Sequence, residues 1–146
     1  MLSRKAKYGL KALIHLAQRA GEGPVLIEEL ARAEGIPRKF LEQILLELKK
    51  KGLLHSRKGR GGGYQLGRAP EEIFMGEIVR VLDGPLAPVP CVSVIAYRKC
   101  DECPDENACG IRLVMKEVRD SIAHILDTAS LADVLTRIER ARRGKP

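Results

Sequence analysis

The sequence predicts a mostly α-helical protein that carries one short β-hairpin and one long helix near its C-terminus. Aromatic residues make up 3% of the 146 residues and tryptophan is absent, so the core must be aliphatic, which suits packed helices. Apolar residues recur at three- and four-residue spacing along most of the chain, and a glycine-rich segment interrupts this period. We expect one domain, or a small domain with an attached oligomerisation element.

Three helices are predicted before residue 53. The first spans residues 3–20 with Ser3 as its N-cap, and the second is about nine residues long and ends at Gly35. The third begins at Pro37 and carries a continuous apolar stripe. A short helix, a tight turn and a longer amphipathic helix are typical of a helix-turn-helix, whose second helix enters the major groove of DNA. An ordinary helical hairpin with a solvated face explains the same pattern.

Residues 53–66 predict two short strands around a glycine-rich tip. Alternation replaces the helical period, and four glycines among residues 59–63 allow a tight hairpin with positive φ angles. The tip of this hairpin carries three basic residues, Arg57, Lys58 and Arg60. A basic hairpin directly after a helix-turn-helix is typical of a wing, which can reach the DNA backbone or the minor groove. The segment has neither the spacing nor the following helix of a nucleotide-binding loop.

The distribution of charge predicts an anionic partner for the N-terminal half of the chain. The net charge is +7, and residues 1–70 carry 15 Lys and Arg against 6 Asp and Glu, whereas residues 71–146 carry 11 against 13. Nucleic acid is the first candidate, because phosphate neutralisation provides affinity that does not depend on base sequence. A solvated basic surface explains the charge equally well when it is taken alone.

All four cysteines lie within residues 91–109, in a polar segment rich in turn-forming residues. Thiolates gathered in this way predict a metal site whose candidate ligands are Cys91, Cys100, Cys103 and Cys109. An iron–sulfur cluster is favoured over zinc, because a zinc ribbon has two CxxC knuckles and this chain has one. Disulfides and idle thiols are the alternatives. Without a signal peptide or an apolar run of roughly 18 residues, we expect no membrane segment and a cytoplasmic protein with reduced thiols.

The remaining segments suggest how the protein assembles. Residues 71–85 predict a short helix that packs onto the core, and three prolines then form a stiff connector into the cysteine segment. From Ile111 an apolar stripe predicts a helix of about 16 residues, followed by a last helix at residues 130–140 and a frayed basic tail. The stripe needs a partner, and we expect its two-fold mate in a homodimer, or else the protein's own core.

This pattern gives the expected organisation of the chain. Residues 1–84 form a winged helix-turn-helix DNA-binding domain with a two-stranded β wing, residues 85–110 a cysteine-rich cluster-binding loop, and residues 111–146 a long dimerisation helix with a C-terminal helix and tail.

Taken together, these pieces resemble the Rrf-type winged helix-turn-helix transcriptional regulators, the bacterial family of IscR-like and NsrR-like proteins. The resemblance covers residues 1 to about 135 and rests on the order and spacing of five features. They are Lys7-Tyr8 in the first helix, the segment 40–45, the segment 56–66, the helix at 78–83, and the cysteine segment followed by a long helix.

The resemblance implies a homodimer that binds a palindromic operator in double-stranded DNA. Lys39, Glu42 and Gln43 match the family's base-contacting positions, and Lys58 matches the wing residue that enters the minor groove. The chemistry agrees, since Gln can bond adenine and Glu can accept from cytosine. The full set of candidate DNA-binding residues is Arg38, Lys39, Glu42, Gln43, Arg57, Lys58 and Arg60.

The family resemblance also bears on the cysteines. Cluster-binding members use three, the last two separated by five residues, as are Cys103 and Cys109. Cys91 takes the place of the first, although it lies farther upstream than in the family. The fourth ligand of relatives, a His or a partner-subunit Asp, falls here at Arg112 or Lys7, and neither side chain can coordinate a metal.

Cys100 is extra, and we expect it to complete an all-cysteine site, with a three-cysteine site and a small extra ligand as the alternative. We favour a 2Fe-2S cluster over 4Fe-4S, with zinc as another possibility. The predicted function is a regulator that senses iron–sulfur, redox or nitric oxide status. A regulator with zinc or a thiol redox switch is the first alternative, and a small iron–sulfur electron carrier or assembly protein is the second. We find no constellation of catalytic residues and predict no enzyme.

Overall fold

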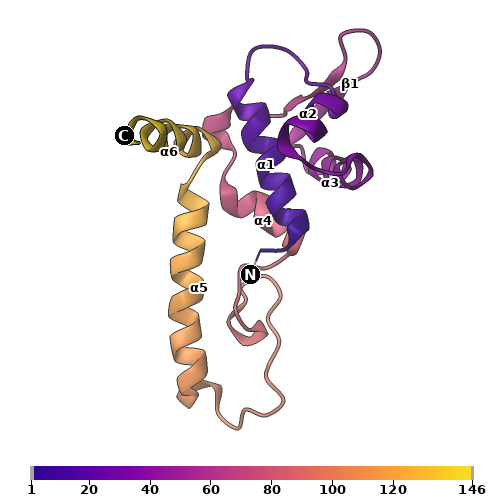
Figure 1. Cartoon of the computed structure of the whole chain (residues 1–146). Coiled ribbons are helices and arrows are strands. Elements are labelled where there is room, and N and C mark those ends of the chain that lie inside the picture. Colours follow the sequence, from indigo (N-terminus) through magenta and orange to yellow (C-terminus); the bar gives the residue numbers. More distant parts are fainter. Residues whose placement is uncertain (1, 146) are drawn as a thin grey trace.

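The computed structural model describes residues 2–145. A compact head holds most of the helices and the hairpin, and one long helix extends away from it (Figure 1). None of the described helices combines the length and apolarity that a membrane crossing needs. The elements are α1 (Arg4–Gln18), α2 (Ile27–Glu34), α3 (Arg38–Lys50), β1 (Leu54–Arg57), β2 (Gly63–Leu66), α4 (Met75–Asp83), α5 (Gly110–Thr128) and α6 (Leu131–Arg143), with short 3-10 turns at Pro70–Glu72, Pro90–Val92 and Glu106–Ala108. The mostly α-helical class with a two-stranded wing is confirmed.

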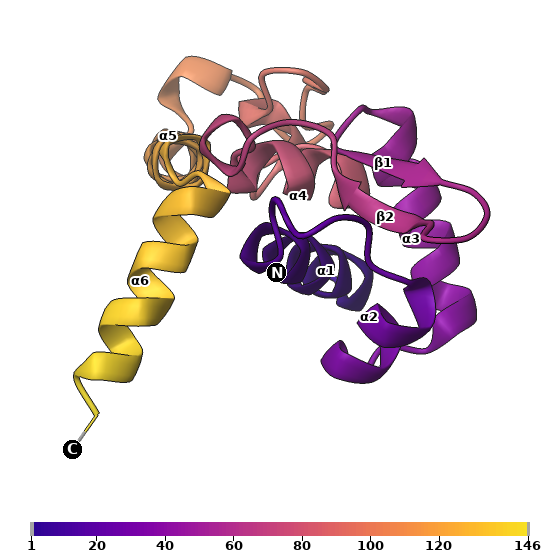
Figure 2. The same ribbon diagram turned by 90° about the horizontal axis from the view of Figure 1, so that it is seen from above.

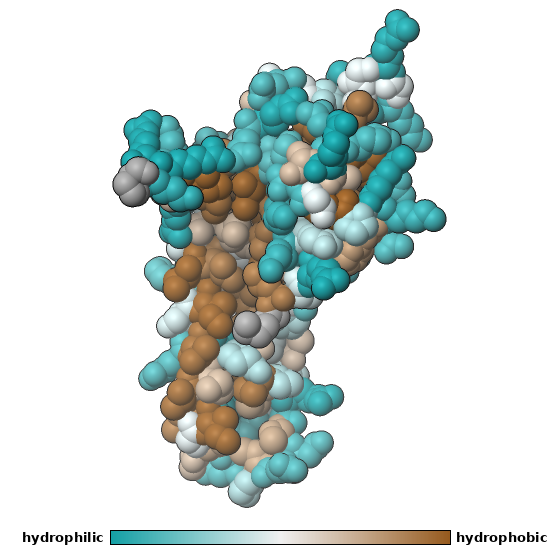
Figure 3. Space-filling model, viewed as in Figure 1, coloured by the Kyte–Doolittle hydropathy of each residue, from teal (hydrophilic) through white to brown (hydrophobic). Residues whose placement is uncertain are grey.

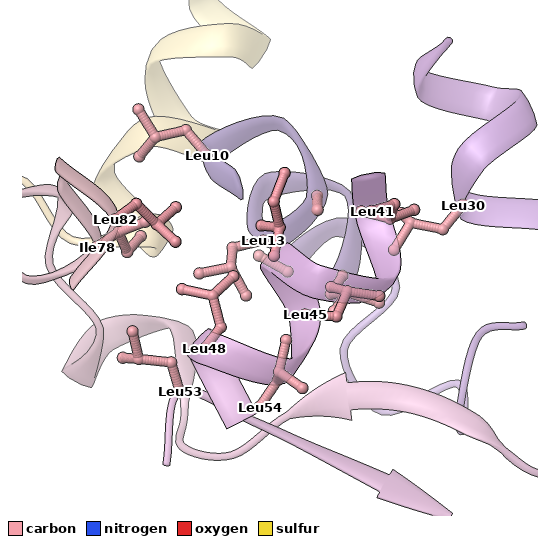
Figure 4. Close-up of a cluster of buried hydrophobic side chains, with 14 of the residues drawn as sticks. Leu10, Leu13, Leu30, Leu41, Leu45, Leu48, Leu53, Leu54, Ile78 and Leu82 are labelled. Atoms are coloured by element: carbon pink, nitrogen blue, oxygen red, sulfur yellow. The ribbon is translucent and has the colours of Figure 1, made fainter. Parts of the chain in front are cut away.

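Aliphatic side chains fill the head, as the low aromatic content predicted (Figure 4). Helix α1 lies against α3, α4 and α6. Tyr8 of α1 and Phe40 of α3 make an edge-to-face contact with ring centroids 5.5 Å apart. The largest fully buried side chains are Leu13, Val25, Leu30, Leu41, Ile44, Leu45, Leu48, Leu53, Leu54, Ile73, Ile78 and Leu131.

The turn between α2 and α3 has the geometry expected of a helix-turn-helix. Gly35 ends α2 in the left-handed conformation at φ 65°, which glycine adopts without steric cost. The buried side chain of Ile36 anchors the turn, and its backbone N–H donates to the Ala31 carbonyl at 2.9 Å. Pro37 then precedes the first residue of α3. The turn is therefore fixed from both sides, and it fixes the direction in which α3 leaves.

The hairpin is antiparallel, with Leu54 opposite Leu66 and Arg57 opposite Gly63. Strand β2 has a further pairing that the sequence did not indicate. Val25, between α1 and α2, exchanges two backbone hydrogen bonds with Tyr64 of β2, at 2.8 and 2.7 Å. Strand β2 is therefore tied to the head close to the loop end of the hairpin, and only the loop between Arg57 and Gly63 extends beyond this contact.

The predicted helix over residues 71–85 is wrong at its start, because α4 begins at Met75. Residues 73–75 are instead paired with the segment that joins α5 to α6. The N–H of Met75 donates to the Ala129 carbonyl at 2.9 Å, and that of Leu131 donates to the Ile73 carbonyl at 2.8 Å. This pairing between distant segments outweighs the local helical pattern, and it leaves α4 to pack on α1 as expected.

Helix α5 spans 19 residues, longer than the sequence predicted, and none of them is buried. Its apolar stripe stays open to solvent as a band along the rod (Figure 3). The chain then turns at Ser130, which caps α6, and Leu131 returns to the core of the head. Seen from above, α6 extends away from the hairpin (Figure 2). It runs through Arg143, so part of the tail predicted to be frayed is helical.

Candidate nucleic-acid interface and cysteine-rich pocket

One face of α3 gathers the polar side chains expected to reach bases. Lys39, Glu42 and Gln43 are all exposed, whereas Leu41 and Ile44, from the opposite face, are fully buried. Burial of that apolar stripe fixes the rotation of the helix about its axis. The structure therefore brings the three polar residues together on one outward surface.

Arg38 is held at the start of α3 by two carboxylates. Its Nη2 lies 3.0 Å from Glu28 Oε1, and its Nε lies 3.4 Å from Glu42 Oε1. All three side chains are about half exposed, so each ion pair contributes about 0.2–1 kcal/mol and exchanges readily. Glu42 is thus partly neutralised before it meets any ligand. Spacing indicates the pair with Glu42, but the pair with Glu28 depends on how α2 and α3 pack.

The wing presents three exposed cations at its tip, Arg57, Lys58 and Arg60. Within residues 2–145, none of them forms an ion pair. Gly62 keeps the loop tight, because a Cβ there would lie 2.3 Å from the Arg57 carbonyl oxygen. The hairpin and α3 lie on the same side of the head in both views, away from α6 (Figures 1 and 2). Open positive charge thus lies on the same side as the polar face of α3.

The four cysteines line one pocket of about 630 Å³ at the N-terminal end of α5. All four are free thiols. The N–H of Cys103 donates to the Cys100 carbonyl at 3.3 Å, which closes the CxxC turn. Burial, followed by the neighbouring Cys109 thiol, raises the pKa of the Cys103 thiol. Cys103 and Cys109 thus lie close together.

Cys91 is held at another point of the pocket wall. Its backbone carbonyl accepts a hydrogen bond from Arg112 Nε, at 3.4 Å, in the first turn of α5. The Tyr97 hydroxyl donates to Glu106 across the loop, and this contact raises the pKa of Tyr97. Arg112 lines the pocket, and the sequence did not single it out for this contact because Cys91 lies 21 residues before it.

The donor set fits a thiolate-ligated group, since soft sulfur ligands suit iron–sulfur clusters and zinc. Among residues 2–145, however, no three Cys, His, Asp or Glu side chains converge closely enough to hold a metal ion. The thiols share a pocket without forming a finished coordination site. Binding a metal centre therefore requires the loop to close around it.

A charged clamp joins α5 to the head. Arg80 of α4 makes two hydrogen bonds to Asp127 of α5, at 2.5 and 2.9 Å. Arg80 lowers the pKa of the Asp127 carboxyl through these bonds. Gly76 makes room for the contact, because a Cβ there would lie 2.0 Å from Asp127 Oδ1. Nothing in the sequence pattern indicates this pair.

Comparison with known proteins found a matching family model and solved structures with a similar fold. A family model described as Rrf2, an iron-dependent transcriptional regulator, matches residues 2–137. The chain is 48% identical to an rrf2-like HTH-type transcriptional regulator of Rhodobacter capsulatus over 138 residues, 92% of each chain. Among solved structures, CymR, the global cysteine regulator of B. subtilis, superposes with a TM-score of 0.78 at 34% identity, covering 94% of this chain and 97% of that one. IscR of T. potens gives a TM-score of 0.78 at 34% identity, covering 100% and 93%.

Proposed function

Because the chain belongs to the Rrf2 family of transcriptional regulators, we propose that it is a cytoplasmic homodimer that binds a palindromic operator and senses iron–sulfur, redox or nitric oxide status through its cysteines. The family's members are named as transcriptional regulators, so the chain is a DNA-binding regulator and not an enzyme. The electron-carrier alternative does not fit this membership. The observation that carries the sensing part is that all four cysteines line one pocket at the start of α5.

DNA binding is proposed to combine α3 and the wing. Lys39, Glu42 and Gln43 would read base edges in the major groove, because their exposed face carries both donors and acceptors. The cations of the wing would bind phosphates or enter the minor groove, and Arg38 would exchange its carboxylate partners for a phosphate. Loss of Lys58 should weaken binding to all sequences alike, whereas loss of Gln43 should relax the sequence preference.

Dimerisation is proposed to use the apolar stripe of α5. Ile111, Val114, Val118, Ile122 and Ile125 are between 38% and 70% exposed, and the chain's own core does not cover them. A second copy placed about a two-fold axis would bury the same stripe on both helices. Ile122→Asp should therefore give monomers in analytical ultracentrifugation. Lys116→Asp, on the opposite side of α5, is the matched control and should leave the dimer intact.

Sensing is proposed to depend on Cys91, Cys100, Cys103 and Cys109 as ligands of an iron–sulfur cluster, with 2Fe-2S favoured and 4Fe-4S or zinc as alternatives. When bound, a cluster supplies a centre that responds to oxidants and nitric oxide. The chain's own residues would hold the loop for it: Arg112 donates to the Cys91 carbonyl, and the backbone hydrogen bond from Cys103 to Cys100 closes the CxxC turn.

A thiol switch in the same regulator is the second candidate, and it is favoured because Cys103 and Cys109 are free thiols that line the same pocket. An oxidant such as hydrogen peroxide would take two electrons from the two thiols, which would lose two protons and form one S–S bond. Such a bond would tie the loop to the start of α5 without any metal.

One experiment separates these candidates. The protein is purified without oxygen and analysed for iron, sulfide and zinc, with visible absorption and EPR after reduction, beside Cys100→Ala and Cys103→Ala. Iron with equivalent sulfide that is lost in Cys103→Ala supports the cluster, and its survival in Cys100→Ala makes Cys100 the spare thiol. Zinc without sulfide supports the zinc site. A metal-free protein that gains a Cys103–Cys109 disulfide with peroxide supports the thiol switch, and unchanged operator affinity in all these states contradicts sensing by the loop.

A further inference from the structure

Leu46 is an apolar residue on the otherwise polar exposed face of α3. Its side chain is 50% exposed, whereas the other leucines of α3 are fully buried. Leu46 is not part of the hydrophobic core of the head. It lies one turn beyond Glu42 and Gln43 on the same side of the helix. An apolar side chain thus sits among the groups proposed to read DNA bases.

The spacing places Leu46 in the same register as the polar readers. Lys39, Glu42, Gln43 and Leu46 occupy positions i, i+3, i+4 and i+7, which is one continuous stripe of a helix. Homeodomain recognition helices contact bases through four positions with this same spacing. A helix that presents the first three positions to the major groove therefore presents the fourth as well.

We propose that Leu46 is a fourth specificity-determining residue of α3 and that it contacts the 5-methyl group of a thymine. Leucine has no donor or acceptor, and the thymine methyl is the apolar group that base pairs display in the major groove. The inference rests on the proposed docking of α3 in that groove. It adds a preference for thymine at a base step that Lys39, Glu42 and Gln43 do not read.

The surroundings of Leu46 favour DNA over a protein partner. Lys49 and Lys50, about one turn farther along α3, are exposed and positively charged, which suits phosphates flanking a groove. Helix α5 lies on a different side of the head from α3 (Figures 1 and 2), so a residue of α3 such as Leu46 does not continue the proposed dimer surface. A protein contact at Leu46 is one outcome that the test below would reveal.

The test begins by selecting an operator from random duplex DNA with the full-length protein. Each thymine of the selected site is then replaced by deoxyuridine, which removes only the methyl group. One thymine per half-site should lower the affinity about four-fold when its methyl is removed, as expected for one buried methyl group. In Leu46→Ala, thymine and deoxyuridine at that position should bind equally.

Leu26→Ala is the matched control, because Leu26 is also about half exposed but lies outside α3. It should keep the discrimination between thymine and deoxyuridine. Thermal unfolding of Leu46→Ala should match the wild type, since an exposed side chain is removed. Discrimination that survives in Leu46→Ala, or a site at which no thymine methyl matters, would overturn the inference and leave Leu46 to solvent or a protein partner. Failure to select any operator would instead count against the proposed docking itself.

Discussion

One methyl group at Gly63 should detach strand β2 of the wing from the head. Gly63 has φ 139°, and a Cβ there would lie 2.4 Å from the Val25 carbonyl oxygen and 3.0 Å from the Leu26 nitrogen. Val25 is the residue that exchanges two backbone hydrogen bonds with Tyr64. In Gly63→Ala, β2 must therefore move away from Val25, and it must also accommodate a backbone conformation that alanine rarely adopts.

The expected loss of stability follows from these two effects. Two backbone hydrogen bonds contribute about 0.5–1.5 kcal/mol each, and a non-glycine residue with positive φ costs about 1–2 kcal/mol. Together they lower the free energy of unfolding by about 2–5 kcal/mol. For a chain of this size the melting temperature should fall by about 6–15 °C. The displaced wing should also lose phosphate contacts, each of which reduces the salt dependence of DNA binding by about 0.9 in log–log slope.

Gly61→Ala separates backbone strain from the contact with Val25. Gly61 also has a positive φ, 74°, but no atom beyond its own and the two adjacent residues lies within 4 Å of the position of its Cβ. Calorimetric unfolding should therefore show about 1–2 kcal/mol of destabilisation for Gly61→Ala, clearly less than for Gly63→Ala. Equal melting temperatures for the two variants would refute the idea that Val25 anchors the wing.

Three further predictions concern the junction of α4, α5 and α6. Leu131→Ala should lower the free energy of urea-induced unfolding by about 2–5 kcal/mol, because Leu131 is fully buried in the head. Ser130→Ala removes the side chain that accepts from the Asp133 N–H, and it should cost about 1 kcal/mol in the same assay. The Arg80–Asp127 pair should contribute about 0.2–1 kcal/mol in a double-mutant cycle at pH 7. Since Arg80 lowers the pKa of Asp127, this contribution should be complete above about pH 4 and disappear as the pH falls further.

Each of these predictions has an outcome that contradicts it. A loss below 1 kcal/mol for Leu131→Ala would mean that α6 is not anchored in the head. Unchanged unfolding of Ser130→Ala would show that the cap is dispensable. A coupling energy that does not decline as the pH is lowered from 4 would exclude the ionised Asp127 carboxylate as its source.

The sequence predicted those parts of the fold that depend on local patterns. The apolar period of α3, the glycines of the hairpin and the stripe of α5 are each contained in one segment, so each element was found in its place. The start of α4 and the bridge at Val25 were missed for a shared reason. Both depend on one or two residues paired with a distant segment, and so short a pairing leaves no period to detect.

The candidate sites also combine residues that a local pattern reveals with contacts that only the packing of distant segments creates. Residue type and spacing were enough to single out the cysteines and the polar face of α3. The contacts that orient these residues, such as Arg112 with the Cys91 carbonyl and Arg38 with Glu28, join different elements and depend on packing. Leu46 was not singled out, although its spacing places it on the polar face, and the fold adds that its side chain is half exposed.

If the cysteine pocket senses a signal as proposed, helix α5 is the element that joins it to the head that carries the DNA-binding surface. Cys109 immediately precedes its first residue, and Asp127, which is clamped to the head by Arg80, lies in its last turn. A helix of 19 residues is about 28 Å long, and it transmits a displacement by moving as a rod rather than by bending. If α5 also pairs with its two-fold mate, closure of the loop around a bound group would reposition both rods together. Both heads would move through their clamps, and the spacing between the two recognition helices would change. Asp127→Asn should therefore leave cysteine chemistry and DNA binding intact. It should reduce the difference in operator affinity between protein with the loop open and protein with the loop closed around a bound group.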